Sequence, residues 1–321
     1  MYTIGIDVGG TKVKLGLFDG DMQIIEQDSF LTDKEASACA LTCYLTAKVR
    51  GLLERRGLGF ADLRGVGAAF PGAIDFEHGR IIEASNLIGY NDQPVRDMLQ
   101  TRMGVPVFVD NDANCAALAE HRFGAGRGQD HMIYACLATG IGGGLILNGR
   151  LYRGMHGMAG EIGHMFVSDS TGYPCGCGVI GCVQSISSGT YMARYAMDRI
   201  KEGEDSRILD YAGTLSNIDT LAVGRALAMN DPLALEVVNR GAEYLGRMFH
   251  SLNEIFDINV FVYGGGITKL GGRFIDRMVA AYRHYTLSDQ KYPARFLPAE
   301  LGDRSELIGA ALLVPEEGKA E

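Results

Sequence analysis

Long runs of positive charge are missing from this sequence. No run of Lys and Arg is longer than two residues, and the formal net charge is −9 at pH 7. A groove for nucleic acid or a face for an anionic membrane needs a cluster of basic side chains. The sequence therefore predicts neither partner. Any phosphate group would have to be held by backbone N–H groups, a metal ion or an isolated basic residue.

Long apolar runs and a secretory leader are also missing. The best candidate for a membrane span, residues 132–147, is interrupted by four glycines, and no stretch of 18 apolar residues occurs. The first residues, MYTIGIDVGG, contain no basic region and enter an alternating pattern at once. We expect a cytoplasmic protein, in which clustered cysteines are more typical of metal ligands than of disulfides.

The chain has enough residues for two domains. It contains 321 residues, of which 47% are apolar, so each half can bury a sizeable core. Length and apolar content therefore predict a globular protein with two domains.

Glycine is abundant, with 44 residues, and it is clustered. Apolar residues alternate over residues 4–8 and again over 13–17, on either side of Gly9 and Gly10. Period-two alternation predicts two strands joined by a tight turn. A dinucleotide-binding fingerprint requires a helix after its glycines, so this pattern excludes a Rossmann domain.

The same design returns later in the chain. Apolar residues 133–138 and 145–147 flank a second glycine cluster, and a third cluster follows the strand-like run 260–263. This repetition indicates a duplication that produced two similar α/β halves. Residues 109–124 read as a strand that runs into a helix. Further helices are predicted over 35–56, 187–203, 218–230, 231–256 and 305–313.

The three glycine clusters are candidate phosphate-binding turns. Glycines let the backbone approach a ligand closely and present N–H groups to its oxygen atoms. A tight hairpin would explain one cluster, but three clusters at strand ends favour a nucleotide. A carboxylate beside the first turn favours a magnesium ion, held through water, between protein and phosphate. The candidates are Asp7, Gly9, Gly10, Thr11, Lys12, Thr139, Gly140, Gly142, Gly264, Gly265 and Gly266.

Three cysteines lie within eight positions, as Cys175, Cys177 and Cys182. A tetrahedral zinc site needs a fourth ligand, which His164 can supply. The alternative is three free or buried thiols. Four protein ligands would leave no open position for water, so the predicted zinc ion is structural.

Asp112 follows the strand-like segment VPVFVDN and stands at the start of the predicted helix. Asp is among the best residues for capping a helix, so a plain cap is one interpretation. A general base held firmly by a helix end is the other. The helix dipole would favour its ionised form.

The sequence resembles the ROK family of sugar kinases and sugar-sensing repressors. The resemblance covers nearly the whole chain and rests on six segments in the family's order and spacing: DVGGT, VDNDAN, ATGIGGG, GMHGMAGEIGH, CGCGVIGC and YGGGI. It implies an actin-like, ribonuclease H-like ATPase fold with two α/β domains and a cleft between them. We expect residues 1–114 plus 302–321 to form the small domain, and 115–301 to form the large domain with the zinc motif.

The resemblance also implies a function. The implied protein is a kinase that transfers the γ-phosphate of ATP to the 6-hydroxyl of a hexose, most simply glucose. The implied cofactors are a magnesium ion and a structural zinc ion. Asp112 would be the catalytic base, and the four zinc ligands would be those named above. Homo-oligomers are frequent in the family, so a dimer is expected. The implied sugar contacts are Asn86, Asn111, Asp112, Glu161, His164 and Gln184.

The chain departs from the family at Gln184. Kinases of this family usually place a glutamate two residues after the last zinc cysteine. A carboxylate only accepts hydrogen bonds, whereas an amide also donates them. Either Gln184 replaces the glutamate with little effect, or the preference shifts toward another hexose or an N-acyl sugar. Kinases for N-acetylmannosamine or N-acetylglucosamine are therefore the alternative enzymes.

A regulator remains as a hypothesis of another class. Repressors of the family carry an added N-terminal DNA-reading domain, for which we expect no room before the first glycine turn. A sugar sensor without catalysis stays open, although Asp7, Asp112 and three complete glycine clusters favour an enzyme.

Overall fold

The computed structural model describes residues 1–33, 35–84 and 89–315. They form two compact units, and the chain passes between the units four times. The first unit comprises Met1–Asp130, Gly144–Gly160 and Glu300–Glu321, and the second comprises His131–Gly143 and Glu161–Ala299. The first unit thus extends beyond the division expected at residue 114, because the helix Asp112–Phe123, which contains that point, packs against the last helix of the chain.

The first sheet contains the predicted hairpin. Its strand order is β3-β2-β1-β4-β7, with β1 antiparallel to β2 and parallel to β4. The tight turn lies between β1 and β2, which confirms the interpretation of the first glycine pair. The strands are β1 (Tyr2–Val8), β2 (Lys12–Phe18), β3 (Ile24–Leu31), β4 (Leu63–Phe70) and β7 (Val107–Asn111). A small separate sheet pairs β5 (Ala73–Asp75) with β6 (Arg80–Glu83).

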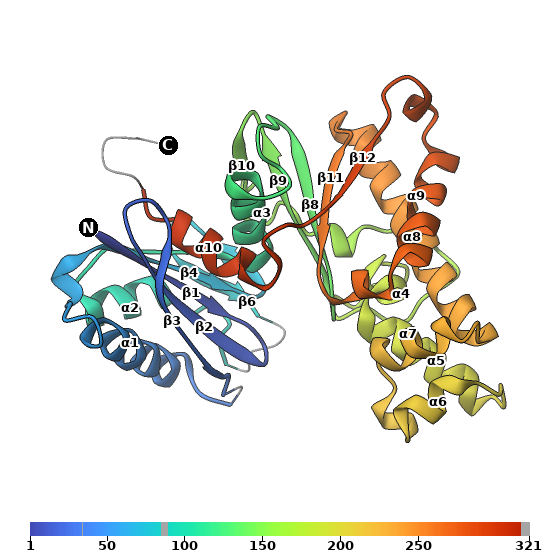
Figure 1. The fold of residues 1–321 in the computed structure, drawn as a ribbon, viewed down its shortest axis with the longest axis horizontal. Coiled ribbons are helices and arrows are strands. Elements are labelled where there is room, and N and C mark those ends of the chain that lie inside the picture. Colours follow the sequence, from blue (N-terminus) through green and yellow to red (C-terminus); the bar gives the residue numbers. More distant parts are fainter. Residues whose placement is uncertain (34, 85–88, 316–321) are drawn as a thin grey trace. The chain divides into compact units, whose positions relative to one another are not determined.

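Helices cover both faces of this sheet (Figure 1). α1 (Ala38–Glu54) and α2 (Val95–Met103) lie on one face, where their apolar side chains join those of β1 in one buried cluster. α10 (Ser305–Leu312) lies on the other face and also packs against α3 (Asp112–Phe123). The C-terminal helix therefore completes a unit that begins at the N-terminus.

Two glycines allow α10 to approach its neighbours. A Cβ atom at Gly309 would overlap the carbonyl oxygen of Cys115 in α3. A Cβ atom at Gly67 in β4 would overlap the carbonyl oxygen of Ala310. Backbone stands against backbone at both places, so neither contact can be relieved by rotating a side chain.

We expect Gly309→Ala to lower the free energy of unfolding by about 1–3 kcal/mol, because overpacking a close contact forces backbone shifts. Urea unfolding followed by circular dichroism measures the change. Gly51→Ala is the matched control, since Gly51 lies in α1 and a Cβ there meets nothing within 4 Å. Alanine in that helix should stabilise the protein by about 0.5–1 kcal/mol. Equal effects of the two substitutions would refute the packing argument.

The second sheet repeats the design of the first. Its strand order is β10-β9-β8-β11-β12, with β11 parallel to β8 and to β12. In each sheet the first strand of the hairpin, β1 or β8, is the central strand. The second strand of the hairpin lies on one side of it, and a strand parallel to it lies on the other side. The strands are β8 (Met132–Leu137), β9 (Ile141–Leu147), β10 (Arg150–Tyr152), β11 (Val260–Gly264) and β12 (Arg295–Pro298). The common order supports the predicted duplication.

The second unit contains most of the helices. α8 begins after Asp231, whose side chain accepts the N–H of Ala234, and packs along α9. Phe249, Phe261 and Phe296 pack with Tyr282 in its core. The helices are α4 (Gln184–Ser187), α5 (Gly189–Lys201), α6 (Arg207–Ala212), α7 (Thr220–Ala228), α8 (Pro232–Phe256) and α9 (Gly272–Tyr285). Helices α5, α7 and α8 confirm the three predictions for this region, whereas α4, α6 and α9 were not predicted.

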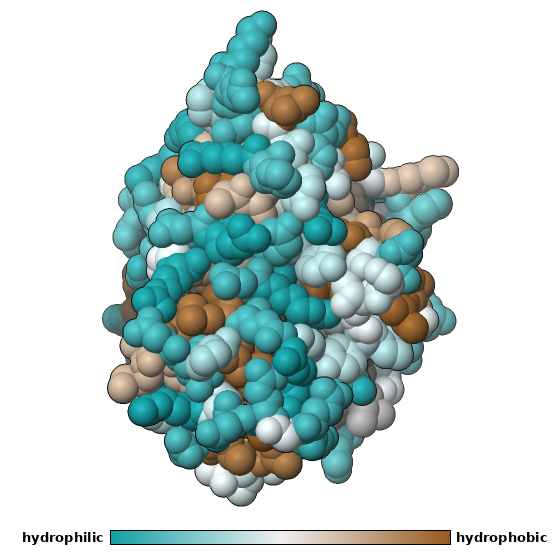
Figure 2. All heavy atoms as spheres, turned by 90° about the vertical axis from the view of Figure 1, so that its right-hand side faces the viewer, coloured by the Kyte–Doolittle hydropathy of each residue, from teal (hydrophilic) through white to brown (hydrophobic). Residues whose placement is uncertain are grey.

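The outer face of the protein in Figure 2 is mainly hydrophilic, and its apolar side chains are divided by polar ones. In the part of the chain that the structure describes, no helix combines the length and the apolar character needed to cross a membrane.

Candidate functional site

The first glycine turn joins β1 to β2. The N–H of Gly9 donates to the carbonyl oxygen of Lys12 at 3.0 Å, and the hydroxyl of Thr32 donates to the carbonyl oxygen of Gly9 at 2.6 Å. Gly10 and Thr11 occupy the turn itself. The turn is thus fixed by hydrogen bonds with Lys12, which begins β2, and with Thr32, which directly follows β3.

Asp7 lies in β1 opposite Lys14 in β2. The Nζ of Lys14 lies 3.0 Å from a carboxylate oxygen of Asp7 and 2.6 Å from the carbonyl oxygen of Asp303. Burial raises the pKa of Asp7, although the charge of Lys14 opposes that shift. Because Lys14 already balances the charge, a metal ion held through water fits Asp7 better than a directly bonded one.

Asp112 is the first residue of α3, but Asn111 is the cap. The side chain of Asn111 accepts the N–H groups of Ala113 and Asn114 at 2.9 and 3.1 Å, and its amide donates to the carbonyl oxygen of Gly72. The interpretation of Asp112 as a plain helix cap is therefore wrong, because the preceding asparagine, an equally good capping residue, does that work. Asp112 accepts the N–H of Ala113 at 2.8 Å.

A buried ion pair stabilises the junction between β7 and α3. The Nε of Arg153 lies 2.8 Å from a carboxylate oxygen of Asp110, and its guanidinium stacks 3.6 Å from the ring centre of Phe76. The other oxygen of Asp110 accepts the N–H of Asn111 and the side-chain amide of Asn114. Asp110 thus connects Arg153 to the residues at the start of α3.

The predicted zinc ligands lie together in the second unit. One ligand atom from each of His164, Cys175, Cys177 and Cys182 lies within 4.8 Å of all the others. The backbone N–H of Val179 is the main cause that lowers the pKa of Cys177, to about 7. Three sulfur atoms and one imidazole at this spacing match a tetrahedral zinc site, so the donor set fits the predicted ion.

The imidazole of His164 has a defined direction. Its Nδ1 lies 3.6 Å from the sulfur of Cys175, while its Nε2 lies 3.8 Å from a carboxylate oxygen of Glu161. Nδ1 is therefore the nitrogen that faces the metal-binding group. Nε2, on the other side of the ring, faces Glu161, and the predicted sugar contacts of both residues stay predictions.

Gln184 begins α4 and lies between two predicted sites. Its Oε1 accepts the N–H of Ile141 at 3.0 Å, and its Nε2 donates to the sulfur of Cys175 at 3.8 Å. A Cβ at Gly140 would stand 3.0 Å from the same Oε1. The side chain therefore connects the cysteines to the second glycine turn.

The second and third glycine clusters meet at one cavity of about 800 Å³. Gly264 ends β11 beside Cys136 of β8, and Gly265 and Gly266 follow it. The second cluster lies at the turn into β9, which contains Gly142. Thr139 and Gly266 line the cavity, together with Ala138, Gly189, Thr190, Ala193, Arg194, Met197, Asp198, Lys201, Ile218, Asp219, Thr220 and Ile267.

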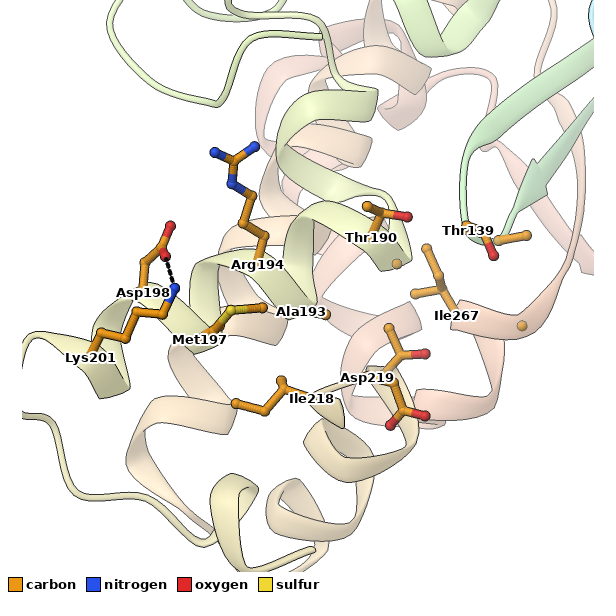
Figure 3. A pocket seen from close by; sticks show the side chains of 14 residues that line it. Thr139, Thr190, Ala193, Arg194, Met197, Asp198, Lys201, Ile218, Asp219 and Ile267 are labelled. Carbon is orange, nitrogen blue, oxygen red and sulfur yellow. Dashed lines mark ion pairs between the residues drawn. The ribbon is translucent and has the colours of Figure 1, made fainter. Parts of the chain in front are cut away.

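The cavity has two different ends (Figure 3). Thr139, Thr190 and Ile267 lie near the glycine turns, whereas Arg194 and the ion pair of Asp198 with Lys201 extend along α5. The volume and the mixture of hydroxyl, charged and apolar side chains suit a nucleotide-sized ligand.

Sequence reasoning missed most of the cavity and the ion pair of Arg153. The cavity residues of α5 and α7 have the ordinary composition of helices, so the sequence gives no sign of them. For Asp110 the available signal was its place in the segment VDND, two residues before Asp112. Asn86 lies outside the described residues, and Asn111 and Asp112 belong to the first unit, whereas Glu161, His164 and Gln184 belong to the second.

Comparison with known proteins shows the family. Residues 3–317 match the model of the ROK family. A glucokinase of Halalkalibacterium halodurans is 35% identical over 98% of this chain and 96% of its own length. An N-acetylmannosamine kinase of Salmonella typhi is 30% identical over 98% of each chain.

The fold agrees with these similarities. A crystal structure of a ROK family glucokinase from Streptomyces griseus, in complex with glucose and AMPPNP, is 33% identical and has a TM-score of 0.82 over 98% of this chain and 99% of that one. The predicted actin-like, ribonuclease H-like ATPase fold is thereby confirmed. By sequence and by fold, the chain belongs to the ROK family.

Proposed function

We propose that this protein is an ATP-dependent kinase that phosphorylates the 6-hydroxyl of a hexose, with glucose as the first candidate. The observation that carries the proposal is the cavity of about 800 Å³ beside the second and third glycine turns. The similarity to glucokinases supports the same activity. A homo-oligomer stays a prediction.

ATP would bind in this cavity with its phosphates toward the glycine turns. Backbone N–H groups of the turns and the hydroxyl of Thr139 are available to phosphate oxygens. Met197 and Ile218 offer apolar surface to the base. A magnesium ion near Asp7, bound through water, would neutralise charge on the phosphates.

Asp112 is the proposed general base. The oxygen of the sugar's 6-hydroxyl attacks the γ-phosphorus in line, its proton passes to the carboxylate of Asp112, and ADP leaves. Asn111, fixed by its own hydrogen bonds at the cap, would hold a sugar hydroxyl. Glu161 and the Nε2 of His164 are the proposed contacts from the second unit, and a zinc ion on the other nitrogen would hold the imidazole in place.

A coupled ADP-release assay tests the proposal. With ATP and magnesium, we expect glucose to give the highest kcat/KM in a panel with fructose, mannose, allose and the N-acetyl sugars. Phosphorus NMR should place the new phosphate on the 6-oxygen. 6-Deoxyglucose is the matched control and should give no ADP above the background of ATP hydrolysis. Absence of ADP release with every sugar would instead identify a sensor.

An N-acylhexosamine kinase is the second candidate. It is favoured by Gln184, whose amide stands where the family's kinases usually have a glutamate, and by the similarity to the N-acetylmannosamine kinase. The same panel decides, because this candidate requires an N-acetyl sugar to exceed glucose in kcat/KM. The predicted contact of Gln184 with the sugar stays a prediction.

A further inference from the structure

The loop that contains the three cysteines, residues 173–182, is attached to the wall of the cavity at two places. One attachment is made by Gln184 to the second glycine turn. The other is made by Tyr173 and Pro174 to α5, whose residues line the cavity.

The first attachment depends on an amide group. Gln184 accepts from the N–H of Ile141 and donates to the sulfur of Cys175. Ile141 lies two residues after Thr139, which lines the cavity. An amide can fill both roles at once, whereas a carboxylate could only accept and would face the sulfur of a metal-bound thiolate. A glutamine at this position is therefore explained by the contacts themselves.

The second attachment reaches the other end of the cavity. The hydroxyl of Tyr173 donates to a carboxylate oxygen of Asp198 at 2.8 Å, and the guanidinium of Arg194 lies 4.3 Å from the ring centre of Tyr173. Tyr191 of α5 donates to the carbonyl oxygen of Pro174, which directly precedes Cys175.

We propose that Gln184 and Tyr173 are positioning residues, through which the metal-bound cysteine loop holds the nucleotide cavity in its binding shape. Cys175 is the common point, because it is a candidate ligand and touches Gln184. A metal ion that fixes Cys175 fixes both attachments, so it increases the affinity for ATP as well as ordering the sugar contacts. This inference rests on the proposed function, in that the cavity binds ATP.

Isothermal titration calorimetry with ATP and magnesium, without sugar, tests the proposal on the metal-loaded protein. Tyr173→Phe loses the hydrogen bond to the carboxylate of Asp198, and Gln184→Ala loses the hydrogen bonds to Ile141 and Cys175. We expect Tyr173→Phe and Gln184→Ala each to raise the Kd for ATP by about 2- to 10-fold. The matched controls are Tyr292→Phe and Gln290→Ala, at exposed positions away from the cavity lining. They should leave the Kd unchanged.

Removal of the metal gives the decisive measurement. A zinc chelator should raise the Kd for ATP of the parent protein, and it should raise that of Gln184→Ala by a smaller factor, since one of the two attachments is already broken. Metal content, measured by emission spectrometry, and circular dichroism verify that each sample is depleted and folded. A general loss of structure would weaken binding equally in both proteins, so it would not produce this difference.

The outcomes separate the inference from the function on which it rests. If the parent protein binds ATP and neither metal removal nor the two substitutions change the Kd, the inference is wrong while the kinase proposal stands. If ATP binding responds as expected but no sugar gives ADP, the kinase proposal fails and the inference stands. If the parent protein binds no ATP, both are wrong.

Discussion

The Asp112→Asn variant is expected to lose about 10²- to 10⁴-fold in kcat, the range that a general base contributes. The amide has nearly the same shape as the carboxylate, but it cannot take the proton of the attacking hydroxyl at neutral pH. Helix α3 should stay intact, because Asn111 rather than Asp112 caps it. The KM for ATP should change little, since the cavity lining contains no residue of α3.

Steady-state kinetics with the preferred sugar measures this loss, and thermal unfolding verifies that the variant is folded. Asp97→Asn is the matched control, because Asp97 is an exposed acid in the first turn of α2. That variant should keep the parent's kcat. An Asp112→Asn enzyme as fast as the parent would remove the proposed mechanism, whatever the sugar.

The Arg153→Met variant is expected to lower the free energy of unfolding by about 3–5 kcal/mol, the usual effect of leaving one partner of a buried ion pair alone. Asp110 is buried, and its carboxylate would remain without the guanidinium that now balances it. Because Asp110 also holds Asn111 and Asn114, kcat should fall too. Urea unfolding and kinetics measure the two effects.

An exposed ion pair of the same unit provides the comparison. Arg127 lies 3.3 Å from Glu300 at the surface, so Arg127→Met should change stability by less than about 1 kcal/mol. If the two substitutions changed stability equally, the buried pair would have no special role. If Arg153→Met reduced stability without reducing kcat, Asp110 would not position the start of α3.

Local patterns predicted the elements of the fold well. Alternation around glycines correctly placed the β1–β2 and β8–β9 hairpins, and helical spacing with Asp231 and Pro232 correctly placed the start of α8. The extent of the first unit was beyond such reasoning. Helix α3 belongs to it through packing against α10, and a contact between helices so far apart in the chain leaves no mark on the spacing of either.

The residues of the candidate site were likewise predictable only in part. The four metal ligands were predictable because three of them lie within eight positions and donor chemistry demands a fourth. The choice between Asn111 and Asp112 as helix cap was not, since the two adjacent residues cap equally well. The ion pair of Asp110 with Arg153 joins residues 43 positions apart, and only the folded chain brings them together.

Because α10 comes from the last residues of the chain, the first unit is unfinished for most of translation. The strands emerge from the ribosome first, but one face of their sheet stays uncovered until the C-terminal helix arrives. A nascent chain in this condition exposes apolar surface, which makes it a client for chaperones and prone to aggregate when shortened. A stop codon ahead of residue 305 would therefore damage the N-terminal sheet, and expressing the first 130 residues alone would not yield a stable fragment.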